Sequence, residues 1–163
     1  MHLDTKETDL SESKLGIDVS YFLLCDIAIT EAGSGKQSLI GVYSSLVTQQ
    51  LPFYVNMAVG IGVRVTLPEE KKFTLHVFTP EDQQMFPGVA LPCDWNALKQ
   101  MLKSAPFALL QTCINLQMLQ LSSAGVYRLE LRADEQIIAT YPLHVVKTVP
   151  QQVPAQPPGQ MLN

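Results

Sequence analysis

The sequence lacks a long hydrophobic run and a strong charge of either sign. Its longest apolar stretch, residues 54–67, is interrupted by Arg64 and falls short of the roughly 20 residues that a membrane helix needs. Only 16% of its 163 residues are charged, and the net charge of −4 argues against a nucleic-acid binder dominated by phosphate contacts. The N-terminus has neither a basic start nor an apolar core. We therefore expect no secretory signal, no membrane span and a cytoplasmic location.

Cysteine and histidine patterns that mark metal or catalytic sites are also missing. The cysteines are odd in number and show no CxxC spacing, which supports neither a disulfide framework nor a zinc site: Cys25, Cys93 and Cys113. The histidines are too scattered to supply converging metal ligands: His2, His76 and His144. No cysteine has a histidine nearby in the sequence, and no serine lies in a G-x-S-x-G setting. We expect no metal and no cofactor, and an enzyme is the least favoured class.

The segment Gly33-Ser34-Gly35-Lys36 is the one place that suggests phosphate binding. A phosphate loop needs G-x-x-x-x-G-K-[ST] between a strand and a helix. Here Thr30 stands at the first glycine position, Gln37 follows the lysine, and the next segment has a strand pattern. The pattern therefore favours a hairpin turn.

The chain divides into a core and two terminal segments. Residues 1–14 are polar, and residues 148–163 are uncharged and rich in proline and glutamine. Neither segment can bury enough apolar surface to offset the entropy of ordering, so we predict two disordered tails. Residues 15–147 are left as a single, nearly neutral domain.

Most of this core is predicted to be β-strand. Residues 73–79 and 126–132 alternate cleanly between apolar and polar side chains, as half-buried strands do. Pro142 indicates that the last strand has a free edge at that position. The expected strands are residues 20–30, 37–46, 54–67, 73–79, 107–121, 126–132 and 137–147.

One helix is expected, over residues 94–104. Asp94 is a good N-cap, and Trp95, Leu98 and Leu102 share one face at helical spacing. Residues 107–121 fit both a helix and a strand. We favour a strand because a turn and a clear strand follow at hairpin spacing. Strands at intervals of roughly ten residues with little helix predict an antiparallel β-sandwich.

Two segments resemble a family of small, uncharacterised bacterial proteins. The first is an opening hairpin, with Cys-Asp at the end of a strand, Gly-Lys in the turn and Ile-Gly before an aromatic: Cys25, Asp26, Gly35, Lys36, Ile40, Gly41 and Tyr43. The second is a closing hairpin that begins with Gly-x-Tyr: Gly125, Tyr127, Asp134, Leu143 and Val145. The resemblance implies an immunoglobulin-like sandwich of about seven to eight strands with one short helix. It implies no activity and no catalytic residue.

Asp26 is the most notable carboxylate, because it lies within an apolar strand on the face of Phe22 and Leu24. A buried carboxylate must be paired or hydrogen-bonded. Arg64 is the lone charge within another strand, so an Asp26–Arg64 pair is a candidate buried acid and ion pair. A water-facing position at an edge is the alternative.

Aromatic and methionine side chains gather around the long loop and the helix: Trp95, Phe86, Met85 and Met101. Such residues are enriched at interfaces, although packing over the core is the simpler interpretation. We therefore predict a non-catalytic module that binds an unknown protein partner or forms a homo-oligomer, with no nucleic-acid partner. A small-ligand or carbohydrate-binding module is the alternative, using exposed aromatics such as Tyr21, Tyr43 or Tyr54.

Overall fold

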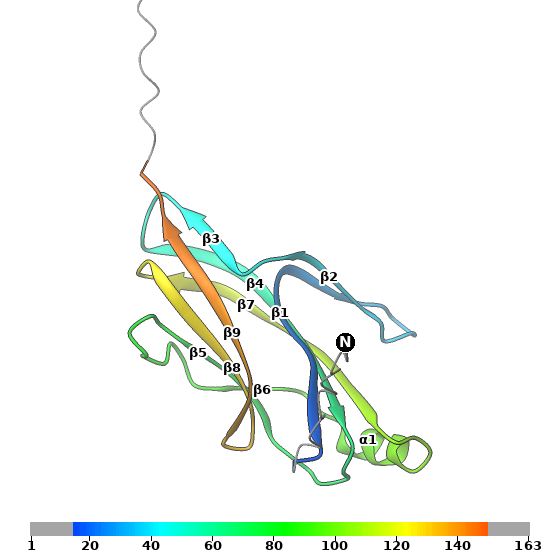
Figure 1. Cartoon of the computed structure of the whole chain (residues 1–163). Helices are drawn as coiled ribbons and strands as arrows, with labels where there is room; N and C mark the ends of the chain where they lie inside the picture. The colour runs from blue at the N-terminus through cyan, green and yellow to red at the C-terminus, as the bar shows by residue number, and fades with distance from the viewer. Residues whose placement is uncertain (1–14, 150–163) are drawn as a thin grey trace, which may run out of the picture.

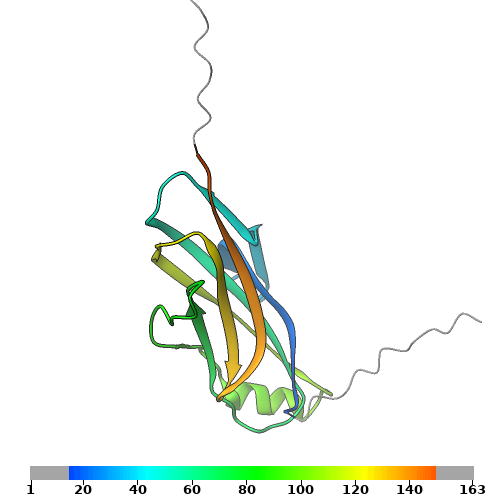
Figure 2. The same ribbon diagram turned by 60° about the vertical axis from the view of Figure 1, so that its left-hand side comes forward.

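The computed structural model describes residues 15–149, which form two β-sheets and one short helix (Figures 1 and 2). The first sheet has the strand order β2-β1-β4-β7: β1 (Ile17–Thr30), β2 (Gln37–Val42), β4 (Phe53–Val65) and β7 (Ala108–Leu121). The second has the order β3-β9-β8-β5-β6: β3 (Ser45–Thr48), β9 (Gln136–Lys147), β8 (Gly125–Ala133), β5 (Phe73–Phe78) and β6 (Val89–Ala90). All neighbours are antiparallel except β3 and β9, which run parallel. The predicted mainly β architecture is confirmed.

A single hydrophobic core lies between the two sheets. Every second residue of the central strands faces it, as the alternating pattern predicts. Edge-to-face contact of Phe22 with Tyr141, at 6.3 Å between ring centroids, joins β1 of one sheet to β9 of the other. The largest fully buried side chains come from both sheets: Tyr127, Phe73, Leu24, Ile61, Leu75, Leu121, Leu129, Leu131 and Leu143.

The predicted strand 37–46 is divided into two strands that belong to different sheets. Gly41, the residue before the last of β2, has a φ of 69°, in the left-handed region that glycine adopts without steric cost. The Tyr43 N–H then donates to Leu24 O at 3.1 Å, and Ser44 O accepts from His144 N at 2.8 Å. Strand β3 therefore begins beside β9. This division and the two-residue β6 within the predicted loop give nine strands in the described residues, where the sequence indicates seven to eight.

The predicted helix is confirmed as α1 (Trp95–Leu102). Asp94 caps it, since its side chain accepts from Ala97 N at 3.0 Å. Leu98 is buried, and the Trp95 ring stacks on Phe73 at 6.1 Å between centroids. The favoured strand over residues 107–121 is also confirmed, as β7.

Strand β9 is paired on both sides only over its last residues. Strand β3 lies beside it from His144 to Lys147, and Pro142 precedes this stretch. The predicted free edge at Pro142 is therefore present among the described residues. The ladder continues past the predicted domain end, because Thr148 N donates to Thr48 O at 2.8 Å.

The predicted N-terminal tail, residues 1–14, lies outside the described residues, as does most of the predicted C-terminal tail, from residue 150 onward. Within residues 15–149, no helix is long and apolar enough to cross a membrane.

Candidate functional site

The predicted Asp26–Arg64 ion pair is not formed. Strand register places Asp18 of β1 directly opposite Arg64 of β4, and Arg64 Nη2 lies 2.5 Å from Asp18 Oδ2. Asp26 is exposed, because β1 runs beyond the core at that point. The Asp18 and Arg64 side chains are 55% and 42% exposed, so this pair adds little stability.

The buried acid of the domain is instead Glu130 of β8, which is 3% exposed. Its Oε1 accepts from Arg128 Nε at 2.8 Å, and its Oε2 accepts from Arg132 Nε at 2.9 Å. Burial alone would raise the pKa of Glu130, but the hydrogen bonds from Arg132 and Arg128 outweigh it and lower the pKa. The alternation of residues 126–132 predicts that Arg128, Glu130 and Arg132 share the outward face of this strand, and the structure shows that they pair there.

We call Arg128, Glu130 and Arg132 the arginine–glutamate network, and further side chains contact it. Arg128 lies 4.8 Å from the centroid of the Phe78 ring and also donates to Asp82 Oδ1 at 2.6 Å. The same Phe78 ring stacks with His76 at 6.4 Å between ring centroids. Both oxygens of the Glu130 carboxylate accept hydrogen bonds from arginines. This carboxylate is therefore not free to act as an acid or base.

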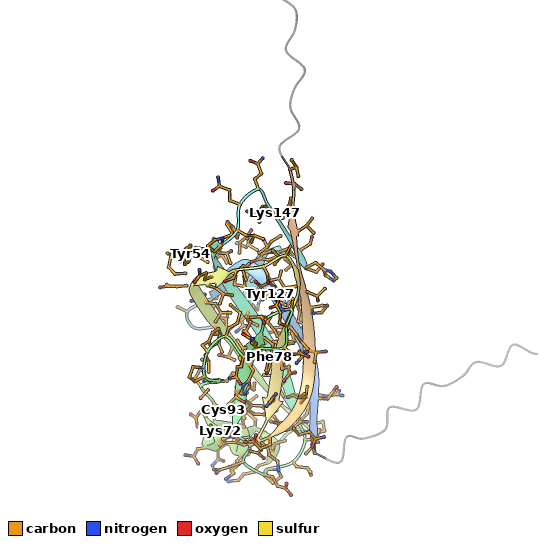
Figure 3. All side chains as sticks on the ribbon, turned by 90° about the vertical axis from the view of Figure 1, so that its left-hand side faces the viewer. Tyr54, Lys72, Phe78, Cys93, Tyr127 and Lys147 are labelled. Carbon is orange, nitrogen blue, oxygen red and sulfur yellow. The ribbon has the colours of Figure 1, made fainter. Side chains whose placement is uncertain are left out.

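A groove of about 610 Å³ lies between the loop after β5 and the C-terminal half of β7. Figure 3 faces this side of the molecule, where the labelled Tyr54 is the β4 residue paired with Gln120 of β7. None of the residues that line the groove is charged, and they mix amide and hydroxyl groups with large apolar side chains: Thr79, Gln83, Gln84, Met85, Phe86, Val89, Asn115, Leu116, Gln117, Met118, Leu119, Gln120 and Ser122. Its surface therefore suits an uncharged ligand that carries both apolar and hydrogen-bonding groups.

A β-bulge shapes the floor of the groove. The register shifts between β4 and β7, so that Gln117 and Met118 stand opposite the single residue Asn56. Met118 has a φ of 52°, and its N–H donates to Asn56 Oδ1 at 2.8 Å. A methionine in the left-handed region is strained, and here its side chain is 66% exposed beside the groove. The Asn56 bond therefore holds a large apolar side chain in solvent at a cost in stability.

Strand β7 also presents a free edge. It is the terminal strand of the first sheet, and no described strand pairs with its far side. Its 14 residues include no charged residue and no proline. Natural edge strands are usually protected by charge, proline or a covering element, and β7 has the bulge and contact with α1 near its start.

The structure separates the four predicted interaction residues into two places. Met85 and Phe86 line the groove. Trp95 lies over the core, where its Nε1 donates to Lys71 O at 3.1 Å, and Met101 is 46% exposed on α1. Two of the four predicted interaction residues therefore lie on the loop wall of the groove. The β7 wall was not predicted, because its distinguishing feature is the absence of charged residues along a strand.

The described residues provide little for covalent or metal chemistry. No group of three or more His, Cys, Asp or Glu in this part of the chain is placed to hold a metal ion. Burial raises the pKa of the Cys25 and Cys93 thiols, whereas a nucleophilic cysteine needs a lowered pKa. Burial, followed by the charge of Asp26, raises the pKa of Tyr43 to about 12, so this hydroxyl stays protonated at neutral pH.

A protein-family model matches residues 20–146, which cover both sheets, the groove and the helix. The chain belongs to the family of unknown function DUF6941. The DUF6941 match confirms the predicted membership of an uncharacterised family, and it begins within β1 and ends within β9, one residue before that strand ends. The bacterial origin suggested by the resemblance stays a prediction. No curated protein matches the chain.

Proposed function

We propose that this DUF6941 protein is a non-catalytic interaction module that binds an extended, uncharged segment of another polypeptide in the groove beside β7. The observation that carries the proposal is the combination of a groove without charged lining residues and a terminal strand without charge or proline. A charged partner segment would lose hydration there and find no opposite charge. An uncharged one loses little and gains apolar contacts.

An extended segment fits because one wall of the groove is the strand β7, whose far edge pairs with no described strand. A peptide that adds to the β7 edge makes main-chain hydrogen bonds, and alternate side chains enter the groove. Met85 and Phe86 from the loop, together with Met118 from the bulge, supply apolar contacts. Gln117 and Gln120, which are exposed on the β7 wall, supply amide groups that donate to and accept from a peptide backbone.

We further propose that the domain is immunoglobulin-like and works in a reducing compartment such as the cytoplasm. Support for the fold comes from Tyr127, which is 1% exposed and donates from its hydroxyl to Ser123 O at 3.1 Å. This matches the tyrosine corner of immunoglobulin-like domains, whose hydroxyl bonds the backbone a few residues upstream. The adjacency of β9, β8 and β5 also agrees with the G-F-C strand order of that fold. Support for the compartment comes from the three described cysteines, which are free.

A small ligand or carbohydrate is the second candidate, because the groove volume falls within the range of small-molecule sites. Of the aromatics proposed for such a site, Tyr54 is 52% exposed, whereas Tyr21 and Tyr43 are partly buried. Phe86 is the one aromatic residue in the groove lining. Stacking surfaces are therefore few, and a polypeptide is favoured.

A displayed library of random peptides, selected on the full chain, tests the proposal. Gln117→Lys places a charge in the groove at an exposed position, and Gln136→Lys makes the same change at the exposed start of β9. We expect the selected peptides to be uncharged, to bind the Gln136→Lys variant normally and to bind Gln117→Lys at least about tenfold more weakly.

Failure to select any peptide, or equal binding to both variants, would contradict the groove as the site. A glycan array probed with the same proteins distinguishes the second candidate. Signal there that Gln117→Lys removes would favour a carbohydrate over a polypeptide.

A further inference from the structure

The last strand of the domain ends close to one end of the groove. Val145 of β9 is paired with Gly125, the first residue of β8, and the last described residue, Val149, follows four positions later. Pro80 of the loop after β5 packs on the same glycine, since a Cβ on Gly125 would lie 2.8 Å from Pro80 Cβ. Thr79, the neighbour of Pro80, lines the groove. The chain therefore leaves the domain beside the groove.

Residues 150–163, called the C-terminal segment below, are long enough to reach along the groove. Figure 3 labels Lys147 toward the same end of the molecule as Tyr54 of β4, whose β7 partner lines the groove. The path from the end of β9 to Ser122 at the groove is about 30 Å at most, from the strand rise and the strand spacing. The 14 residues of the segment extend to about 45 Å. Its second half, residues 157–163, is therefore within reach of the groove.

The C-terminal segment also matches the groove in chemistry. It has no charged side chain, and neither has the groove lining. Met161 and Leu162 are adjacent large apolar residues, and they meet their counterparts in Phe86 and Met118 of the two walls. The segment is too polar to bury apolar surface by itself, and the groove supplies the surface that it lacks.

Proline lowers the entropy that the segment loses on binding. Pro157 and Pro158 favour the extended polyproline conformation, so this part of the chain is ordered at a smaller cost than other sequences. Proline-rich segments bind apolar grooves in this way in other domains. Gln160 follows, with an amide that can bond to the exposed Gln117 or Gln120 of the β7 wall.

The N-terminal residues do not fit the groove. Residues 1–14 carry four acids and two bases, which an uncharged groove would desolvate without pairing. They also precede β1 at the far end of the sheet, where Ile17 is paired with Val65 at the end of β4. The groove lies beside the other end of β4, near Phe53. Of the two terminal segments, the C-terminal one alone combines reach with matching chemistry.

We propose that residues 157–163 occupy the groove of their own chain and compete there with a partner polypeptide, an inference that rests on the proposed function. Tethering distinguishes this occupant from any other uncharged peptide, because a linked segment is present at an effective concentration of about 1 mM. A contact with a Kd of about 0.1 mM then keeps the groove about 90% occupied. A partner binds only by displacing the segment.

Amide chemical shifts of the full chain test the occupant. The double variant Met161→Lys, Leu162→Lys places two charges in the part of the segment that reaches the groove. We expect the shifts of residues 83–86 and 115–120 to differ between this variant and the unaltered chain. Gln151→Lys, Gln152→Lys makes the same changes in the part that only bridges the gap, and should leave those shifts unchanged.

Peptide affinity tests the competition. A peptide selected from the displayed library should bind the Met161→Lys, Leu162→Lys variant about tenfold more tightly than the unaltered chain, because the segment no longer competes. The Gln151→Lys, Gln152→Lys variant should bind the peptide like the unaltered chain. Equal affinity for the two double variants would overturn the inference.

The inference and the proposed function fail in different ways. Groove shifts that are unchanged in Met161→Lys, Leu162→Lys, or that change equally in both double variants, would overturn the inference. The proposed function would still stand if a selected peptide shifts residues 83–86 and 115–120. If the groove shifts change in the first variant alone and no library peptide binds any of the proteins, the groove holds its own segment and the proposed function fails.

Discussion

Strands β7 and β8 follow one another in the chain and face solvent in opposite ways. Strand β8 is central in the second sheet, and its outward side chains form the arginine–glutamate network. Strand β7 is terminal in the first sheet, and its 14 residues carry no charge. The polar atoms of the network bond to one another. Strand β7 instead has an unpaired backbone edge among the described strands, lines the groove and carries the exposed side chain of Met118.

This difference indicates which of the two strands is available to bind a partner. The charged side chains on the central strand β8 bond to one another across its outer face. An edge strand without charge or proline is exposed to pairing with other chains, and Met118 adds backbone strain to that exposure. A domain selected only for stability would protect this edge. Strand β7 is therefore the better candidate for binding, and β8 for stability.

The largest expected effect comes from removing the charge at the centre of the network. Glu130→Gln leaves Arg128 and Arg132 without their shared carboxylate, while the glutamine keeps its size. Because both arginines are partly exposed, we expect a loss of about 2 kcal/mol in the free energy of unfolding, less than for a fully buried pair. Urea denaturation measures it. Glu135→Gln, in the exposed turn before β9, should change stability by less than about 0.5 kcal/mol.

The charge of Glu130 should also make the stability of the domain depend on pH. The pKa of Glu130 is lowered in the folded protein by Arg132 and Arg128 acting against burial, so protons bind more readily to the unfolded chain. The stability that Glu130 contributes is present above the unfolded glutamate pKa of about 4.3 and is lost as pH falls below it. The gap in unfolding free energy between the unaltered chain and Glu130→Gln should therefore narrow from neutral pH to pH values near 3. A gap independent of pH would contradict the role of its charge.

A smaller effect is expected at the bulge. Asn56→Ala removes the acceptor of the Met118 N–H, which we expect to cost about 1 kcal/mol or less because water can replace it at this exposed position. Asn115→Ala, another exposed amide beside the groove, serves as the control. If Asn56 positions Met118, Asn56→Ala should also weaken binding of a selected peptide. Asn115→Ala should preserve the bulge. Equal unfolding midpoints for both variants would argue against the assigned bond.

The smallest expected effect separates strain from binding at Met118. Met118→Gly and Met118→Ala both delete the side chain, but only glycine adopts a φ of 52° without steric cost. We expect the glycine variant to be more stable than the alanine variant by about 0.5–1 kcal/mol. Both should lose affinity for the peptide to a similar extent. Unchanged affinity would show that the exposed methionine does not take part in binding.

Features set by local pattern could be predicted from the sequence. The alternation in residues 126–132 identifies β8, and Asp94 with Leu98 identifies the helix. Features set by pairing could not be predicted. The partner of Arg64 depends on the register of β1 against β4, which local pattern does not fix. The groove depends on β7 and the loop after β5 meeting, although Met85 and Phe86 already marked one wall.

Amide chemical shifts of the full chain, recorded with and without a selected uncharged peptide, would locate the bound peptide. We expect the shift changes to concentrate in residues 83–86 and 115–120, which form the two walls of the groove. Shifts concentrated around Arg128 and Thr140, on the face of β8 and β9, would contradict it. They would show that the charged face binds and that the uncharged strand does not.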